Sequence, residues 1–220
     1  MKVLITAGGT KEYIDGVRFI GNSSSGRTGS VLADYLSAKG HSVVWLGADT
    51  AIRPQKVADQ HHFIGYQDLA SQLQKLLSNN HYDVIFHAAA VSDYQLVGIR
   101  ADGLEVALNR QHKINSQAET LQLTLTKQAK IINQLLDWSV NKEVKVVGFK
   151  LTHTKDLNQQ QQAVEKLLVQ PAVFAVAHND LNDISRHAHP FNLYVKGRDT
   201  YACDDIKAVV NVLMTLWEMG

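Results

Sequence analysis

The sequence predicts an α/β fold, with a mostly parallel sheet flanked by helices. Three observations support this prediction. Short runs rich in β-branched residues alternate along the chain with segments whose apolar residues recur every three or four positions. The first apolar run, Val3-Leu4-Ile5, leads into a glycine turn and then into a helical pattern. No repeat, linker or change of composition divides the 220 residues, so we expect one Rossmann-like domain over 1–220.

Residue spacing and stop signals predict the individual elements. Gly40 follows the first helical pattern as a stop. A second helix is expected where Leu69, Leu73 and Leu77 recur at helical spacing. In chain order, the expected strands are 2–6, 41–46, 83–88, 144–150, 172–177, 191–195 and 200–203, and the expected helices are 26–38, 66–77, 130–138, 156–168 and one from 204 onward.

The middle of the chain is less regular. Leu121, Leu123 and Leu125 alternate with polar residues, which predicts a half-buried strand and, with it, a smaller β-rich segment beside the main sheet. Residues 95–118 show no clear period, so we expect a functional loop there. The glutamine run at 159–162 is expected to face solvent.

Composition narrows the class of protein. A formal net charge of +1 predicts no basic field for nucleic acid and no polybasic membrane patch. No apolar stretch approaches the about 18 residues that a membrane helix requires, and we expect a cytoplasmic protein. The single cysteine, Cys203, cannot form an internal disulfide and is expected to be a packing residue. The histidines are scattered, so no protein-held metal site is expected.

The strongest functional signal lies in the first thirty residues. Gly8-Gly9-Thr10 follows the first strand, and Asn22 to Gly26, with Ser24 and Ser25, precedes the first helix. Free N–H groups and the positive end of a helix dipole favour an anion, and glycine permits its close approach. The alternative is a helix start that is simply capped by Ser or Asn. A charged segment separates the two clusters, so the spacing is not G-x-G-x-x-G.

The third strand ends in small residues followed by a carboxylate. Ala89 and Ala90 would let a flat ligand lie against the backbone, and Asp93 could accept hydrogen bonds from an amino group. A tight turn with Asp93 as its cap is the alternative. Ligands in open α/β sheets bind beyond the carboxyl ends of the strands. This cluster and the two glycine clusters all fall at that edge of the predicted sheet.

Three further residues are weaker candidates. Lys113 could offset charge on a phosphate, although a lysine in an irregular segment is more often only solvated. Phe149 ends another strand and could stack on a base or belong to the core. Asn179 follows the strand at 172–177 and could line the same edge or cap a turn.

Taken together, these motifs resemble the phosphopantothenoylcysteine synthetase (phosphopantothenate–cysteine ligase) family in its free-standing bacterial form. They occur in the family's order and cover most of the chain. The matching segments are Thr6-Ala7-Gly8-Gly9-Thr10, Asp15-Gly16-Val17-Arg18, Asn22 to Gly29, Ala89 to Tyr94, Lys113-Ile114, Gly148-Phe149-Lys150 and Asn179-Asp180.

The resemblance implies an acid–amine ligase of coenzyme A biosynthesis. Its expected substrates are 4′-phosphopantothenate, L-cysteine and CTP, with Mg²⁺ required and an acyl-cytidylate as intermediate. It also implies a homodimer, in which loop segments of one subunit close the site of the other, so the β-rich segment is expected to serve dimerisation or closure. No nucleic acid or membrane partner is expected.

The resemblance also implies roles for particular residues. Asn22 would hold the acyl-cytidylate, Lys113 would neutralise charge during activation, and Asp93 would recognise the cytosine amino group. Gln170 stands where a lysine is expected, and Lys166 lies one helical turn earlier. The other implied nucleotide-binding residues are Gly8, Gly9, Thr10, Ser24, Ser25, Gly26, Ala89, Ala90 and Phe149, and Arg18, Asn179 and Lys166 are expected to contribute to substrate binding.

Two alternatives remain open from the sequence. A short-chain-type NAD(P)-dependent oxidoreductase also has an alanine-rich strand end, but it requires a Tyr-x-x-x-Lys pair late in the fold. Here Tyr35 and Lys39 form such a pair on the first helix. A non-catalytic nucleotide sensor would bind CTP without releasing pyrophosphate.

Overall fold

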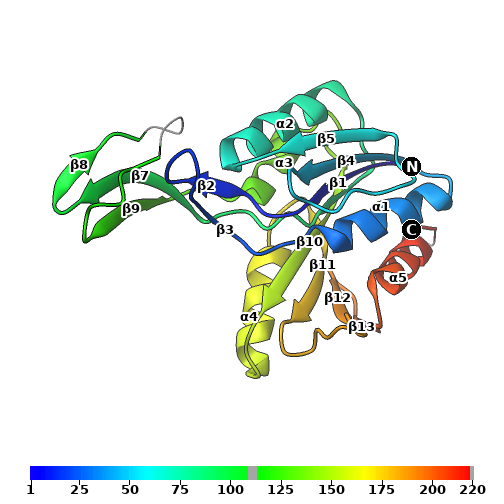
Figure 1. Cartoon of the computed structure of the whole chain (residues 1–220). Coiled ribbons are helices and arrows are strands. Elements are labelled where there is room, and N and C mark those ends of the chain that lie inside the picture. The colour runs from blue at the N-terminus through cyan, green and yellow to red at the C-terminus, as the bar shows by residue number, and fades with distance from the viewer. Residues whose placement is uncertain (109–112, 219–220) are drawn as a thin grey trace.

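The computed structural model describes residues 1–108 and 113–218 of the chain (Figure 1). Its centre is an eight-stranded sheet in the order β13-β12-β11-β10-β6-β1-β4-β5. These strands are β1 (Lys2–Ala7), β4 (Ser42–Ala48), β5 (Asp59–Phe63), β6 (Val84–His87), β10 (Lys145–Thr152), β11 (Val173–Asp180), β12 (Phe191–Val195) and β13 (Thr200–Cys203).

Six strands of this sheet, β5, β4, β1, β6, β10 and β11, run parallel to one another. At the β11 edge, β12 pairs antiparallel with β11, and β13 pairs antiparallel with β12. Counted along the chain, the parallel strands have the order 3-2-1-4-5-6, which is that of the doubly wound dinucleotide-binding fold. The order reverses between β1 and β6. The predicted α/β Rossmann-like fold is therefore confirmed, and the carboxyl ends of β1 and β6 flank the place where such folds bind ligands.

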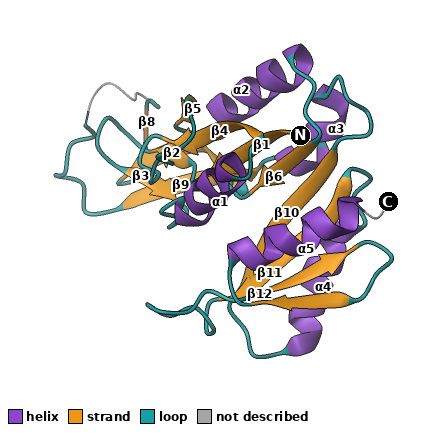
Figure 2. Ribbon diagram, turned by 90° about the vertical axis from the view of Figure 1, so that its right-hand side faces the viewer, coloured by secondary structure: helices purple, strands orange, loops and turns teal. Residues whose placement is uncertain are grey.

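Helices cover both faces of this sheet, which explains why its central strands are apolar throughout. Val3, Leu4 and Ile5 of β1 are fully buried. The helices α1 and α5 pack on each other over one face, and α2, α3 and α4 lie over the other (Figures 1 and 2). Their bounds are α1 (Arg27–Ala38), α2 (Tyr66–Asn79), α3 (Leu135–Trp138), α4 (Leu157–Leu168) and α5 (Ile206–Glu218). No helix among the described residues has the length and apolarity needed to cross a membrane.

A three-stranded antiparallel sheet, which we call the arm, projects from the main sheet (Figure 1). It consists of β7 (Tyr94–Ala101), β8 (Leu104–Val106) and β9 (Leu121–Lys127) in the order β8-β7-β9. The strand predicted around Leu123 is confirmed, but the expectation that it is half-buried is wrong, because Leu121 and Leu125 are exposed. The loop predicted over 95–118 is wrong in its first part, because β7 and β8 occupy 94–101 and 104–106. Residues 109–112 of the predicted loop lie outside the described part of the chain. A register shift between Leu96 and Gly98 breaks the two-residue period of β7 and hides it from pattern analysis.

Three smaller differences from the predicted elements have local causes. The charged segment after β1 folds into a hairpin of β2 (Lys11–Tyr13) and β3 (Phe19–Gly21). β5 was not predicted because its sequence is polar, as suits an edge strand paired only with β4. The helix predicted over 130–138 is divided into η1 (Ile131–Asn133) and α3, since two β-branched isoleucines and an asparagine favour a helix weakly.

Candidate active site

The segments that follow β1 and β6 lie against each other at the sheet edge. Gly9 and Ala90 form an isolated parallel bridge. The Ala90 N–H donates to the Gly8 carbonyl at 2.8 Å, and the Thr10 N–H donates to the Ala90 carbonyl at 3.1 Å. Thr10 Oγ1 accepts from the Ser92 N–H at 2.8 Å. Four residues predicted to bind nucleotide are therefore adjacent, at the point where the strand order reverses.

The second glycine–serine cluster meets the first. A Cβ on Gly9 would lie 2.3 Å from the carbonyl oxygen of Asn22, so only glycine allows these two backbones to pass. Gly26 has a φ of 71° and is the N-cap of α1, and its Cα lies close to Gly8, whose nitrogen a Gly26 Cβ would approach to 3.2 Å. The residues that the sequence placed in two distant peptides thus form one surface beside Asn22.

The start of α1 is not closed by a capping side chain. Its N-cap is Gly26, and no side chain of a described residue makes a cap hydrogen bond there. The one nearby contact is a long bond of 3.4 Å from the Arg27 N–H to Ser25 Oγ. The capped-helix interpretation of Ser24 and Ser25 is therefore disfavoured, and the first N–H groups of α1 retain their capacity to bind an anion.

A cavity of about 540 Å³ lies between the ends of β6 and β10 and the residues of η1 and α4. Ala89 and Val91, the chain neighbours of Ala90, line it, whereas the predicted residues of the two glycine clusters do not. Of the predicted site residues, Ala89, Asp93, Phe149 and Lys166 line it. Gln170, which stands where a lysine was expected, also lines it. The lining also includes residues that were not predicted as site residues: His87, Lys130, Lys150, Gln159 and Gln162. The last two belong to the run that was expected only to face solvent.

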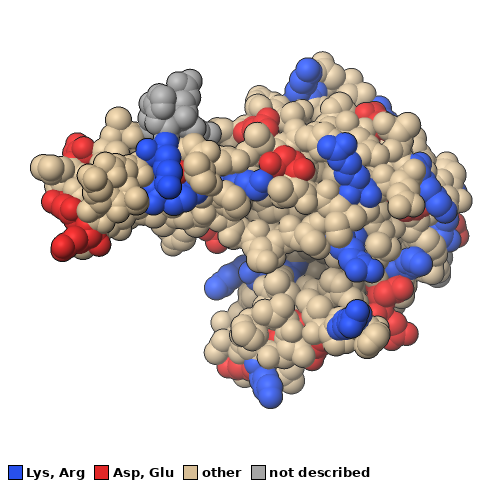
Figure 3. All heavy atoms as spheres, in the orientation of Figure 1, with Lys and Arg blue, Asp and Glu red and all other residues tan. Residues whose placement is uncertain are grey.

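The charge of the cavity wall favours an anionic ligand. Lys130, Lys150 and Lys166 line it, whereas Asp93 is its single carboxylate among the described lining residues. Asp93 and Lys130 form an ion pair at the mouth, and both side chains are about half exposed. Figure 3 shows Lys or Arg side chains at the hollow between the arm and the part of the molecule that carries α4.

His87 adds a neutral group to this wall. Its side chain is buried, and burial lowers its pKa from 6.5 to about 4. Thr6 Oγ1 lies 2.9 Å from His87 Nδ1 and accepts a hydrogen bond from the Ala89 N–H. The threonine hydroxyl can donate to Nδ1 of the neutral tautomer that carries its proton on Nε2.

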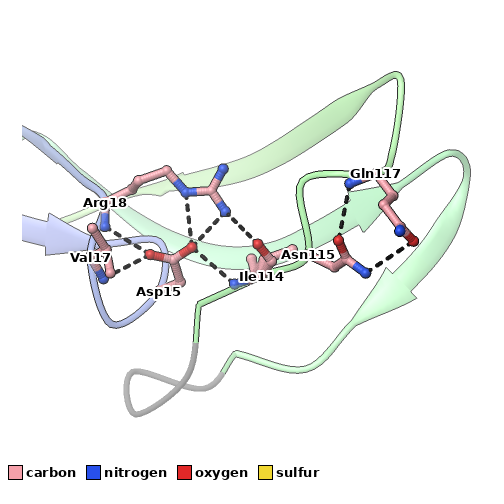
Figure 4. A network of polar contacts seen from close by, with 6 residues as sticks. All are labelled: Asp15, Val17, Arg18, Ile114, Asn115 and Gln117. Carbon is pink, nitrogen blue, oxygen red and sulfur yellow. Dashed lines mark hydrogen bonds and ion pairs between the residues drawn. The ribbon is translucent and has the colours of Figure 1, made fainter.

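Arg18 belongs to a separate network with Asp15 and Ile114 at the base of the arm (Figure 4). The buried Asp15 carboxylate accepts from Arg18 Nε at 2.9 Å and from the backbone N–H of Ile114 at 3.1 Å. Hydrogen bonds, above all that from Arg18, hold the pKa of Asp15 well below its usual range. Lys113, next to Ile114, is exposed and does not line the cavity of its own chain.

Asn179 also lies apart from the cavity lining. Its Nδ2 is 2.8 Å from His189 Nε2. The adjacent Asp180 accepts from Thr152 Oγ1 at 2.6 Å and from the Thr154 N–H at 3.0 Å, so it holds the turn after β11. The structure thus gives this pair of residues contacts that stabilise a loop.

The Tyr35–Lys39 pair does not occupy a catalytic position. The Tyr35 hydroxyl donates to Asn211 Oδ1 of α5 at 2.7 Å, and Lys39 Nζ lies 5.1 Å from the centre of the Tyr35 ring. Both residues lie at the end of α1 opposite to Gly26. This placement disfavours a short-chain-type oxidoreductase.

Fold and site together define an α/β protein with the strand order of the dinucleotide-binding fold and a cavity lined by three lysines. Residues 1–193 match the family described as the DNA/pantothenate metabolism flavoprotein C-terminal domain, and the chain belongs to this family. The family resemblance noted from the sequence motifs is therefore confirmed.

Solved structures agree with this assignment. The DNA/pantothenate metabolism flavoprotein from Streptococcus pneumoniae has a TM-score of 0.85 and 26% identity, and the match covers 100% of this chain and 99% of that one. A Cab2 mutant in complex with phosphopantothenate-cysteine has a TM-score of 0.68 at 19% identity, over 98% of this chain and 85% of that one. At this identity the second likeness shows the fold alone.

Curated relatives are longer proteins. The coenzyme A biosynthesis bifunctional protein CoaBC of Methanocaldococcus jannaschii is 26% identical over 190 residues, which are 84% of this chain and 41% of that protein. The CoaBC protein of Mycolicibacterium smegmatis is 41% identical over 105 residues, 46% of this chain and 24% of that protein. The chain thus spans less than half the length of these relatives.

Proposed function

We propose that this chain is a phosphopantothenate–cysteine ligase that uses CTP in coenzyme A biosynthesis. One observation carries the proposal: the two glycine clusters meet beside Asn22, next to a cavity lined by three lysines, at the reversal point of the sheet. Family membership and relatives named for coenzyme A biosynthesis support it.

The reaction explains why such a site is useful. The 4′-phosphopantothenate carboxylate attacks the α-phosphorus of CTP, pyrophosphate leaves, and an acyl-cytidylate forms. The cysteine amine then attacks the acyl carbon, loses a proton, and CMP leaves with the electrons of the acyl–oxygen bond. A carboxylate is a poor acylating agent until its oxygen becomes part of a phosphate leaving group. Catalysis therefore depends mainly on positioning and on stabilising negative charge.

The residues divide this work by their chemistry. Backbone N–H groups at Gly8, Gly9 and the start of α1 donate to phosphate oxygens. Lys150 and Lys166, which line the cavity, offset the charge on the departing pyrophosphate. Asn22, at the junction of the glycine clusters, holds the acyl-cytidylate, and Asp93 accepts from the amino group of the base.

Magnesium is expected to bind with the nucleotide. No group of three His, Cys, Asp or Glu residues in the described part of the chain could hold a metal ion. Mg²⁺ commonly uses one or two carboxylates together with substrate phosphates and water. The donors of this cavity wall, three lysines and Asp93, do not form a metal site by themselves, and we assign no catalytic step to a resident ion.

We further propose a homodimer formed through the arm. The arm leaves apolar side chains exposed, including Val97, Leu104 at 75%, Leu121 and Leu125. A three-stranded sheet of this size gains stability when such a surface is covered. A second copy is the occupant that also explains Lys113, since this lysine lies outside the cavity of its own chain and would act in the partner's site.

The activity is tested by incubating the protein with CTP, 4′-phosphopantothenate and Mg²⁺, with and without cysteine. We expect pyrophosphate release and, with cysteine, a product of the ligated mass together with CMP. Binding of CTP without pyrophosphate release would instead identify a nucleotide sensor. A change in nicotinamide absorbance with carbonyl substrates would identify an oxidoreductase.

Subunit exchange tests the dimer and the position of Lys113. Lys113→Gln should suppress activation, and Asn22→Asp should slow turnover of the intermediate. In a mixed dimer, one site would combine an intact Asn22 with the partner's intact lysine. Mixing the two inactive variants in equal amounts should therefore restore about a quarter of the wild-type activity if exchange is statistical. No recovery, with exchange confirmed by mass-tagged chains, would place Lys113 in its own subunit's site.

A further inference from the structure

The ion pair at the cavity mouth joins two walls that are fixed relative to each other. Asp93 follows β6, and Lys130 immediately precedes η1. The Gln128 N–H donates to the Asp93 carbonyl at 2.8 Å, and Gln128 Nε2 donates to the Ser92 carbonyl at 3.4 Å. The Tyr66 hydroxyl holds the neighbouring Ala129 carbonyl at 2.8 Å. The two charged side chains therefore extend from anchored backbone segments.

The pair retains hydrogen-bonding capacity toward the cavity. Lys130 Nζ contacts Asp93 Oδ1, and no other hydrogen bond to the Asp93 carboxylate is present among the described residues. Oδ2 is left as an acceptor, and the ammonium group has two further donors. Both side chains line the cavity and are about half exposed, so a ligand can reach them.

An acceptor beside a donor matches one kind of nucleotide base. Cytosine and adenine each carry an amino donor next to a ring-nitrogen acceptor. Uracil presents a carbonyl acceptor next to an N–H donor, which is the reverse order. In the same pose, a uracil would place acceptor against acceptor and donor against donor, leaving polar groups unpaired in a site that excludes part of the water.

We propose that Lys130 is a specificity-determining residue, which with Asp93 recognises the amino and ring-nitrogen edge of the nucleotide base. The inference rests on the proposed nucleotide-dependent ligase activity. The two side chains that would recognise the base thus come from positions 37 residues apart in the chain.

The test compares Lys130→Gln with Lys127→Gln, a control on the exposed end of β9 that does not line the cavity. The measured quantities are kcat/KM for CTP and UTP in pyrophosphate release, and Kd for CMP and UMP by calorimetry. Because a hydrogen bond to a charged group is lost, the Lys130 variant should lose preference for CTP over UTP by about tenfold. The loss should fall on cytidine nucleotides, with CMP and CTP weakened by the same factor. Lys130→Arg should recover most of the preference.

Several outcomes would overturn this assignment. An equal loss of kcat/KM for CTP and UTP would make Lys130 a phosphate ligand or a folding residue. A larger weakening of CTP than of CMP would make it a phosphate ligand. An unchanged CTP preference would remove it from base recognition, as would a wild-type protein that binds CMP and UMP equally. A wild-type protein that discriminates between CMP and UMP but releases no pyrophosphate would refute the ligase proposal alone.

Discussion

The buried His87 makes a quantitative prediction about stability and pH. Its pKa is lowered by burial to about 4 in the folded protein, against an ordinary value of 6.5. Between these two values the unfolded chain binds a proton that the folded chain does not, so stability falls as the pH decreases from 6.5 to 4. The difference corresponds to about 3 kcal/mol of unfolding free energy, fully lost only below pH 4.

The assay is urea unfolding at pH 7.0 and pH 4.5. His41, His62, His178 and His189 also have pKa values lowered mainly by burial, so the wild-type protein loses more stability than His87 alone explains. The informative quantity is therefore the difference from a His87→Asn variant, in which the amide oxygen can accept from Thr6. This variant should lose about 2–3 kcal/mol less than wild type over the same pH change.

A matched control and a direct titration make the prediction refutable. His153→Gln changes an exposed histidine and should leave the pH dependence as in wild type. Histidine NMR should show a resonance of His87 titrating near pH 4. Two results would refute this reasoning: an equal loss of stability in wild type and His87→Asn, or a His87 resonance that titrates near pH 6.5. Either would mean that burial does not keep His87 neutral.

Three further results are expected. Gly9→Ala forces a Cβ against the Asn22 carbonyl, so it should abolish CTP binding in calorimetry and lower the free energy of unfolding by about 1–3 kcal/mol. Gly98→Ala is the control: its Cβ would meet Thr124 only at 3.4 Å, and it should bind CTP normally. Lys150→Gln should weaken CTP more than CMP, because it removes a cation from the cavity wall; equal weakening would argue against a phosphate contact. A variant made monomeric by charged substitutions on the apolar surface of the arm should bind CTP in calorimetry yet release little pyrophosphate; full activity in the monomer would refute a shared site.

The sequence allowed the main sheet to be predicted because its signals are local. Val3 to Ile5 form a continuous apolar run, as a strand buried on both faces requires. The polar β5 and the bulged β7 gave no such signal, since the first is defined by its pairing with β4 and the second changes register at Leu96. Elements defined by their partners are therefore the ones that pattern analysis missed.

The candidate site divides in the same way. Gly8, Gly9 and Gly26 could be predicted because a turn or a close backbone approach demands glycine at a fixed place after a strand or before a helix. Lys130 had no comparable signal. Its importance depends on Asp93, which lies 37 residues earlier and meets it only in the folded chain. Isolated lysines in a sequence are usually solvated, and only the folded structure shows that Lys130 lines the cavity.

The distribution of charge leads to a division of labour between binding and activation. The resemblance assigned the activating charge to Lys113, but the cations that line the cavity are Lys130, Lys150 and Lys166, from the same chain. In the proposed site these three lysines would hold a nucleotide without any help from the arm. The Asp15 carboxylate fixes the backbone at Ile114, so Lys113 is carried on an anchored segment outside its own site. In the proposed homodimer a lysine held in that way would act in the cavity of the other subunit, so that chemistry, but not nucleotide binding, would depend on assembly.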